Sequence, residues 1–296
     1  MGSLVSFCQI VNSELILWSE GICHHNLEVA RHSVLSVGTK IRKYNRISCH
    51  SINIPNDHIK ALETTISLGL GHFIADNREE LDAIEQEASA RGITQKILLR
   101  LTPGIDPHTY EAVATGKVDS KFGVAIETGQ AEVFVASAAM CSNVKVRGYH
   151  CHVGSQVFDE EGSVYTDAAK IMFSFMAEMN EKYFLNADVL NMGGGYGVRY
   201  VESDPYVDIP ANIHKVAKFV KELAAKLNVP MPKILMEPGR SIVADAGMTL
   251  YTCGTVKKIP GYKNYVSIDG GMPDNPRYAL YGSAYTVMLA NRAQDK

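Results

Sequence analysis

The chain has 296 residues, of which 46% are hydrophobic and 21% charged, and its formal net charge is −3. This balance is typical of a soluble globular protein, and it argues against nucleic acid as the main partner because phosphate binding needs a concentrated basic surface. No apolar stretch is long enough to span a membrane. The six cysteines are scattered without paired spacing, which predicts reduced thiols in a cytoplasmic compartment.

The first 45 residues carry only a weak structural pattern. Short strands are expected in LVSFCQIV (4–11) and ELILW (14–18), and a helix in HNLEVARHSVLSVG (25–38). We therefore expect an irregular region here.

From residue 46 onward, short β-branched runs alternate with amphipathic stretches, the pattern of βα units around a parallel sheet. Helices are predicted over 77–92 and 211–229, the second with an apolar stripe at helical spacing. A closed barrel of this type needs eight strands, so residues 1–45 must supply the remainder. The predicted fold is an α/β (β/α)8 barrel, incomplete or distorted at its N-terminus. Six strands are expected, in RISCHSI (46–52), HFIAD (72–76), KILLRL (96–101), VRGYHCHV (146–153), VLNM (189–192) and KILM (233–236).

After residue 248 the pattern of apolar and polar residues changes. The stretch TLYTCGTVKKIPGYKNYVSIDGG (249–271) holds two alternating runs joined by Pro260-Gly261, which predicts an antiparallel hairpin. We expect two domains, a barrel over 1–247 with 1–45 irregular, and the start of a C-terminal β domain over 248–296.

Polar and glycine-rich groups follow several of the predicted strands, at the end where α/β barrels place their active sites. They are Arg100, HCHVGSQ (150–156), GGGYG (193–197) and EPGR (237–240). GGGYG lacks the GxGxxG spacing of a dinucleotide site, so it is either a phosphate cradle or a plain tight turn. Arg100 is either structural or directed at a ligand.

The two histidines of HCHVGSQ do not form a metal site with the cysteine between them. The strand period of two sends His150 and His152 to one face and Cys151 to the other, so the three cannot chelate one ion together. No metal is predicted.

Together these motifs resemble those of the fold-type III pyridoxal-phosphate decarboxylases, most closely the diaminopimelate decarboxylases. The motifs are ATGKVDSKFG (114–123), HCHVGSQ, LNMGGGYG (190–197), EPGRSIVADAG (237–247) and the run from Thr249 to Ala293 that contains NPRYALYG. The resemblance covers about four fifths of the chain, from roughly residue 56 to the end, and it implies pyridoxal phosphate as cofactor.

The resemblance also implies a role for each matching residue. His152 would lie against the pyridine ring, and Glu237 would pair with the pyridinium nitrogen, which keeps the ring protonated as an electron sink. The phosphate would be held by Ser155, Gly193, Gly194 and Gly195, with Gly239 and Arg240 completing the anion site. The distal end of the substrate would contact Arg240, Arg277 and Tyr281. The alternative for the arginines is a surface ion pair.

The lysine that forms the Schiff base in this family lies on the first barrel strand, in a context such as YAVKAN. The nearest match here is FCQIVNS (7–13), which places Ile10 at the lysine position. An aliphatic side chain cannot form an imine. The family's C-terminal cysteine motif and late tyrosine would lie beyond Lys296. We therefore expect a chain truncated at both ends, with no certain catalytic residue.

The leading hypothesis is decarboxylation of meso-2,6-diaminopimelate to L-lysine in lysine biosynthesis, by a cytoplasmic homodimer that acts on a small amino acid. One alternative is a non-catalytic homologue that binds pyridoxal phosphate or regulates a partner. Another is an ornithine or arginine decarboxylase, which is less favoured because arginines suit a distal carboxylate better than a distal amine.

Overall fold

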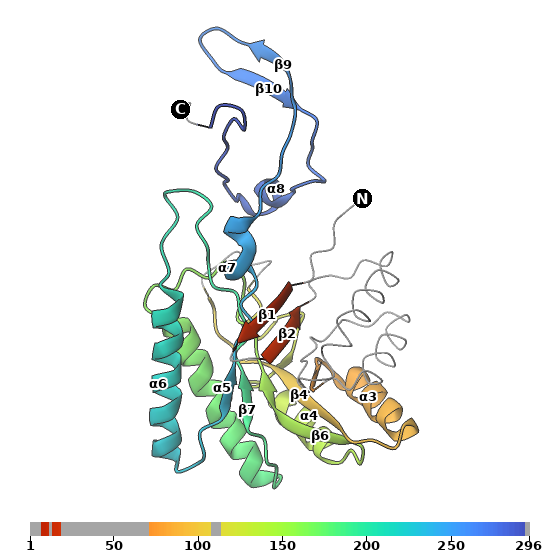
Figure 1. Cartoon of the computed structure of the whole chain (residues 1–296). Helices are drawn as coiled ribbons and strands as arrows, with labels where there is room; N and C mark the ends of the chain where they lie inside the picture. The colour runs from red at the N-terminus through yellow and green to blue at the C-terminus, as the bar shows by residue number, and fades with distance from the viewer. Residues whose placement is uncertain (1–6, 12–13, 19–70, 108–113, 294–296) are drawn as a thin grey trace.

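The computed structural model describes residues 7–11, 14–18, 71–107 and 114–293 (Figure 1). Its centre is a parallel sheet in which β3, β4, β6, β7 and β8 are neighbours in that order and β5 pairs with β4. The strands are β3 (Phe73–Ala75), β4 (Gln95–Thr102), β5 (Val124–Ala125), β6 (Val144–His150), β7 (Val189–Asn191) and β8 (Lys233–Leu235).

The sheet confirms five of the six predicted strand runs. β3, β4, β6, β7 and β8 lie within or across the expected segments, and all their pairings are parallel. The run at 46–52 lies outside the described residues. Strand β5 was not predicted, because two residues are too few to show a period.

In the described part of the chain, β3, β5, β6 and β7 are followed by α3 (Arg78–Ala90), α4 (Gln130–Ala139), α5 (Ser163–Lys182) and α6 (Ile209–Leu227), respectively. The helices predicted over 77–92 and 211–229 are confirmed as α3 and α6. The side chain of Asp208 caps the start of α6 by accepting from the backbone N–H of Ala211, and Pro210 occupies the first turn. The helix ends at Asn228, whose left-handed backbone (φ +54°) stops its propagation.

Strand β4 divides the core into two layers. Ile97, Leu99 and Leu101 belong to the large cluster that the helices cover. Leu98 points the other way and packs with Ile74, Val189 and the partly buried Leu235. Because strand side chains alternate between faces, this second cluster marks the inner face of the sheet.

The N-terminal strands differ from the sequence-based expectation. β1 (Phe7–Val11) and β2 (Glu14–Trp18) pair antiparallel in a two-stranded sheet of their own, so in the described part of the chain they do not extend the parallel sheet. The two-residue connection explains the difference, because parallel neighbours need a much longer crossover. The assignment of Ile10 to the first barrel strand therefore lacks support from the pairing.

Beyond the sheet lie α7 (Arg240–Val243), a 3-10 turn (Ala244–Ala246), β9 (Cys253–Lys258), β10 (Asn264–Ile268) and α8 (Arg277–Tyr281). β9 and β10 form the predicted antiparallel hairpin, and Gly261 adopts φ +78° in its turn. Figure 1 shows this hairpin extending away from the parallel sheet. The domain boundary at 247/248 stays a prediction. No helix in the described ranges is long and apolar enough to cross a membrane.

A buried carboxyl group stands at the start of α3. Asn77 caps the helix by accepting from the backbone N–H of Glu80 at 2.9 Å, and the Glu80 carboxylate accepts from the backbone N–H of Asp76 at 2.7 Å. Burial raises the pKa of Glu80 from 4.5 to about 7.

Glu80→Gln is expected to stabilise the protein at pH 8 but not at pH 5. Between pH 4.5 and 7 the folded state binds more protons at Glu80 than the unfolded state, so stability falls as pH rises through this window. The amide removes that penalty while its oxygen can still accept from Asp76, a gain of about 1–3 kcal/mol. Urea unfolding at pH 5 and pH 8 measures this change in the free energy of unfolding. Glu79→Gln on the exposed face is the matched control, and an equal gain at both pH values would contradict the assignment.

Candidate functional site

The register of the parallel sheet places three polar side chains in one row near the carboxyl ends of the strands. Arg100 on β4 pairs with His150 on β6, and His150 pairs with Asn191 on β7. Two residues earlier, the same faces carry Leu98 and Val189 of the inner cluster. This polar row of Arg100, His150 and Asn191 therefore lies next to the inner cluster, which forms an apolar floor.

Glu237 lies where this row meets the end of β8. Its side chain is buried, and its Oε1 accepts from the Asn191 amide at 2.8 Å. Nε2 of His150 lies 3.2 Å from Oε2. An ionised Glu237 carboxylate accepts this hydrogen bond from the tautomer of His150 that carries its proton on Nε2. The two contacts fix the carboxylate plane.

The backbone of Glu237 is tied to the glycine loop that follows β7. Its N–H donates to the carbonyl oxygen of Gly193 at 2.7 Å, and the N–H of Gly193 donates to Oδ1 of Asn191 at 3.0 Å. A Cβ at Gly194 would lie 2.1 Å from the Glu237 carbonyl oxygen. Only glycine permits this approach.

The other two loop glycines are enclosed as closely. Gly193 and Gly195 adopt φ +66° and +96°, and a Cβ at these positions would lie 2.5 Å from the carbonyl of Cys151 and 1.7 Å from that of Gly154. Packing against the loop after β6 therefore requires both glycines. Such a loop also lets backbone N–H groups approach an anion, so close packing and a phosphate cradle are compatible.

The imidazole of His152 lies against this loop. Its Nδ1 accepts from the backbone N–H of Gly194 at 3.2 Å, which places the proton of the neutral ring on Nε2. A Cβ at Gly195 would lie 3.3 Å from Cε1 of the same ring. His152 thus has a fixed tautomer and a fixed orientation beside the loop.

The loops after β6 and β7 are hydrogen-bonded along their length. The Gln156 amide donates to the carbonyl of Val198 at 2.7 Å and accepts from its N–H at 3.1 Å. The N–H of Val157 donates to the carbonyl of Gly195 at 2.9 Å. Ser155 is half-buried beside this ladder. The structure therefore brings Ser155, His152 and the three glycines together.

The segment around ATGK supports the same loop from the other side. The Thr115 hydroxyl donates to the carbonyl of His152 at 2.6 Å, and the N–H of Gly116 donates to the carbonyl of Val153 at 2.9 Å. This part of the quoted motif holds the backbone that carries the imidazole.

Arg100 is a buried cation with a partner. Its Nη1 lies 3.5 Å from Asp76 Oδ1, and its guanidinium lies 4.6 Å from the centroid of the Phe122 ring. Burial lowers the pKa of Arg100, while the carboxylates of Asp76 and Glu237 act in the opposite direction. Burial also raises the pKa of the nearby Cys151 thiol to about 12, so this cysteine is no nucleophile at neutral pH.

The remaining predicted residues lie on the two short helices beyond β8. Gly239 precedes α7, and the Arg240 guanidinium at its start donates to the Tyr200 hydroxyl at 2.5 Å. On α8 the Arg277 guanidinium lies 5.3 Å from the centroid of the Tyr281 ring. Arg240 and Arg277 thus have different aromatic partners.

Sequence reasoning missed three residues of this arrangement. His150 was considered only as a metal ligand, and Asn191 and Tyr200 were not considered. The signal for Asn191 was a polar residue inside the apolar run VLNM, because a buried amide needs partners. Tyr200 carried no comparable signal.

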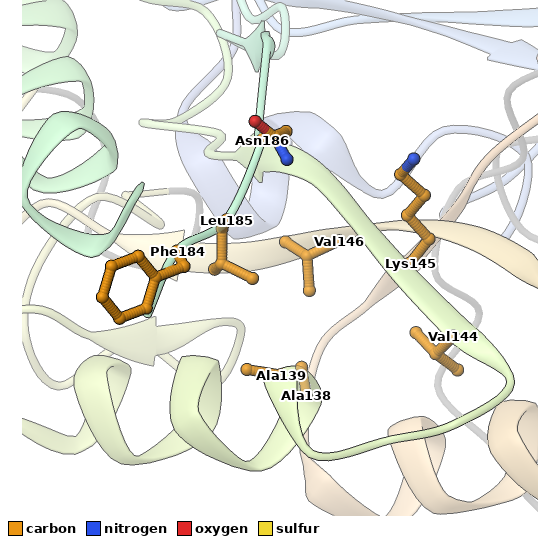
Figure 2. Close-up of a pocket in the computed structure, with 8 residues that line it drawn as sticks. All are labelled: Ala138, Ala139, Val144, Lys145, Val146, Phe184, Leu185 and Asn186. Carbon is orange, nitrogen blue, oxygen red and sulfur yellow. The ribbon is translucent and has the colours of Figure 1, made fainter. Parts of the chain in front are cut away.

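A shallow pocket of about 160 Å³ lies elsewhere, beside the start of β6 (Figure 2). Its lining includes Ala138 and Ala139 at the end of α4, Val144 and Val146 on β6, and Leu185. The carboxyl end of β6 carries His150, so this pocket is at the opposite end of the strand from the polar row.

Comparison with known proteins identifies the family. The family described as "Pyridoxal-dependent decarboxylase, pyridoxal binding domain" matches residues 28–244. Diaminopimelate decarboxylase of Bacillus methanolicus is 42% identical over 231 residues, covering 78% of this chain and 53% of that protein. The Bacillus subtilis enzyme of the same name is 40% identical over 255 residues, covering 85% and 57%. The chain spans about half the length of these curated relatives.

Solved structures agree on the fold. Diaminopimelate decarboxylase of Helicobacter pylori complexed with L-lysine has a TM-score of 0.70 at 25% identity, covering 82% of this chain and 57% of that one. The M. jannaschii enzyme in co-complex with L-lysine also has a TM-score of 0.70, at 27% identity, covering 86% and 57%. The α/β barrel expected from the sequence is thereby confirmed as the fold class. The chain belongs to the pyridoxal-dependent decarboxylase family, through its pyridoxal-binding domain.

Proposed function

We propose that the chain binds pyridoxal phosphate and decarboxylates meso-2,6-diaminopimelate to L-lysine. The observation that carries this proposal is the buried carboxylate of Glu237, oriented by His150 and Asn191 and bonded through its backbone to Gly193. A phosphorylated pyridine suits this arrangement, because the carboxylate can accept from a protonated ring nitrogen while backbone N–H groups of the glycine loop donate to the phosphate. When bound, pyridoxal phosphate supplies the electron sink for the pair left on the α-carbon as CO₂ departs.

In this proposal each protein group has one task, except Arg240, which contacts both the phosphate and the substrate. Glu237 holds the proton on the pyridine nitrogen, because a carboxylate favours the charged form of a neighbouring base. The imidazole of His152 covers one ring face from its fixed position on the loop. Four groups hold the phosphate through backbone N–H groups, a hydroxyl and a guanidinium: Gly193–Gly195, Ser155, Gly239 and Arg240.

The substrate proposal depends on the arginines. Arg240 and Arg277 present planar, permanently charged forks, which suit a distal carboxylate, and Tyr281 accompanies Arg277. Diaminopimelate has a carboxylate at its distal end, whereas ornithine has an amine there. The relatives named above support the same choice, so the ornithine or arginine reading is disfavoured.

We also propose a barrel domain over 1–247 followed by a β domain over 248–296, and a homodimer in the cytoplasm. The separate β9–β10 sheet supports the division, and the names of the relatives support the biosynthetic setting.

A second candidate function is a non-catalytic homologue that binds the cofactor and regulates a partner. The motif match made on the sequence favours it, because that match places Ile10, which cannot form an imine, at the position of the family's lysine.

Replacing Glu237 by glutamine is expected to weaken pyridoxal phosphate binding about tenfold or more, because a neutral amide cannot balance a protonated pyridine nitrogen. Equilibrium dialysis of the cofactor against both proteins measures the dissociation constants. Glu222→Gln, on the exposed face of α6, is the matched control and should bind like wild type. An unchanged constant for Glu237→Gln would remove the central contact from the proposal.

The two candidate functions differ in the fate of the cofactor and the substrate. If the chain is the enzyme, borohydride should fix one pyridoxyl group on one lysine, which peptide mass mapping would locate. Carboxyl-labelled meso-diaminopimelate should then also release labelled CO₂. The non-catalytic homologue predicts neither result, while cofactor binding that depends on Glu237 persists. Reversible binding without labelled lysine would therefore replace the first function by the second.

A further inference from the structure

Tyr200 is the point where the segment after α8 meets the barrel. The loop after the glycine cradle carries Tyr200, whose hydroxyl accepts from Nη1 of Arg240 at 2.5 Å. The ring of Tyr285 is tilted against the Tyr200 ring, with 5.0 Å between centroids. The Thr286 hydroxyl donates to the Tyr200 carbonyl oxygen at 2.7 Å. One residue thus contacts both α7 and the segment after α8.

The contact with Arg240 determines where its charge points. A hydrogen bond from a guanidinium to a hydroxyl is charge-assisted and directional, and the guanidinium carbon also lies 5.9 Å from the Tyr200 ring centroid. A long arginine side chain otherwise has many rotamers, whose loss costs entropy when a ligand binds. Tyr200 reduces this cost in advance.

The contacts with Tyr285 and Thr286 orient the second arginine. Helix α8 begins with Arg277 and ends at Gly282, whose left-handed backbone (φ +61°) turns the chain. Three residues later Tyr285 reaches the Tyr200 ring. Tyr285 is half-buried, although most of the segment from 286 to 293 is exposed. Tyr200 thus anchors the chain shortly beyond the end of α8, the helix that carries Arg277.

We propose that Tyr200 is a positioning residue that couples Arg240 to the segment bearing Arg277 and Tyr281, and that this coupling sets the preference for a substrate with an anionic distal end. The inference deepens the proposed function and rests on it. Tyr200 itself touches no reacting atom. Its effect is to hold two cationic forks at a fixed separation, a geometry that a distal carboxylate requires and a distal CH₂–NH₃⁺ group does not.

Two ligands that differ only in the distal carboxylate test the proposal: L-lysine, which as the product keeps that carboxylate, and 1,5-diaminopentane, which lacks it. L-Lysine and 1,5-diaminopentane are titrated calorimetrically into the protein loaded with pyridoxal phosphate, and neither carries the carboxylate that the reaction removes. Tyr200→Phe keeps the ring but removes the acceptor for Arg240, so L-lysine should bind about tenfold more weakly while binding of 1,5-diaminopentane stays nearly unchanged. Tyr206→Phe is the matched control, because Tyr206 is exposed on the same connection, and it should alter neither ligand.

Hydrogen exchange without ligand tests the coupling separately. Tyr200→Ala removes the stacking contact as well, and faster exchange is expected over 277–289 with no change over β4 and β6, which also shows that the barrel is folded. Unchanged exchange over 277–289 overturns the coupling. An equal loss of both ligands in Tyr200→Phe, or no loss, overturns the role in substrate preference.

The affinities of the wild-type protein test the proposed function separately. If wild-type protein binds L-lysine no better than 1,5-diaminopentane, the substrate proposal is wrong, and with it the preference assigned to Tyr200. The hydrogen-exchange result then decides the coupling alone.

Discussion

The hydrogen bond from the Glu237 N–H to the Gly193 carbonyl oxygen joins the ends of β7 and β8, and the rest of the site depends on it. It brings two backbones so close that a Cβ at Gly194 would lie 2.1 Å from the Glu237 carbonyl oxygen. The carboxylate then reaches the Asn191 amide and the His150 ring without further adjustment. Backbone geometry thus places the one buried anion that the proposed cofactor chemistry needs.

Burying charge in this position has a cost that the structure offsets with partners. Arg100 is paired with Asp76, and the Asp76 carboxylate also accepts from the backbone N–H of Gly123 at 2.9 Å. Removing one member of such a set leaves an uncompensated charge, which costs far more than the pair contributes. The apolar floor, formed by Ile74, Leu98 and Val189, contributes buried hydrophobic surface and has no polar side chains that need hydrogen-bond partners. Rigidity at the polar row therefore comes from mutual satisfaction of charges, and stability from the floor and the helix layer.

The periodicity of apolar residues was sufficient to predict the strands and helices that are determined by the local sequence. The runs in β4, β6 and β7 and the stripe in α6 follow from side-chain alternation, and His152, Gly193 and Glu237 were predicted as site residues from their motifs. The row of Arg100, His150 and Asn191 was not predictable, because it depends on the register shift between Ile97 and Leu98 that pairs Leu98 with Gly148. The contacts of Tyr200 with Arg240 and Thr286 span 40 and 86 residues, and no short-range pattern encodes them.

The residues proposed for the cofactor and those proposed for the substrate lie on elements of different kinds. Glu237, His152 and the glycines are held by buried backbone hydrogen bonds at strand ends, whereas Arg277 and Tyr281 lie on a five-residue helix without a buried residue. A helix this short is not stable by itself and takes its position from tertiary contacts. Under the proposed function, selectivity among amino acids with similar α-carbons would depend on the few contacts that anchor α8, while the chemistry at the α-carbon would depend on the sheet. Substitutions near Tyr200 can change the former without disturbing the latter.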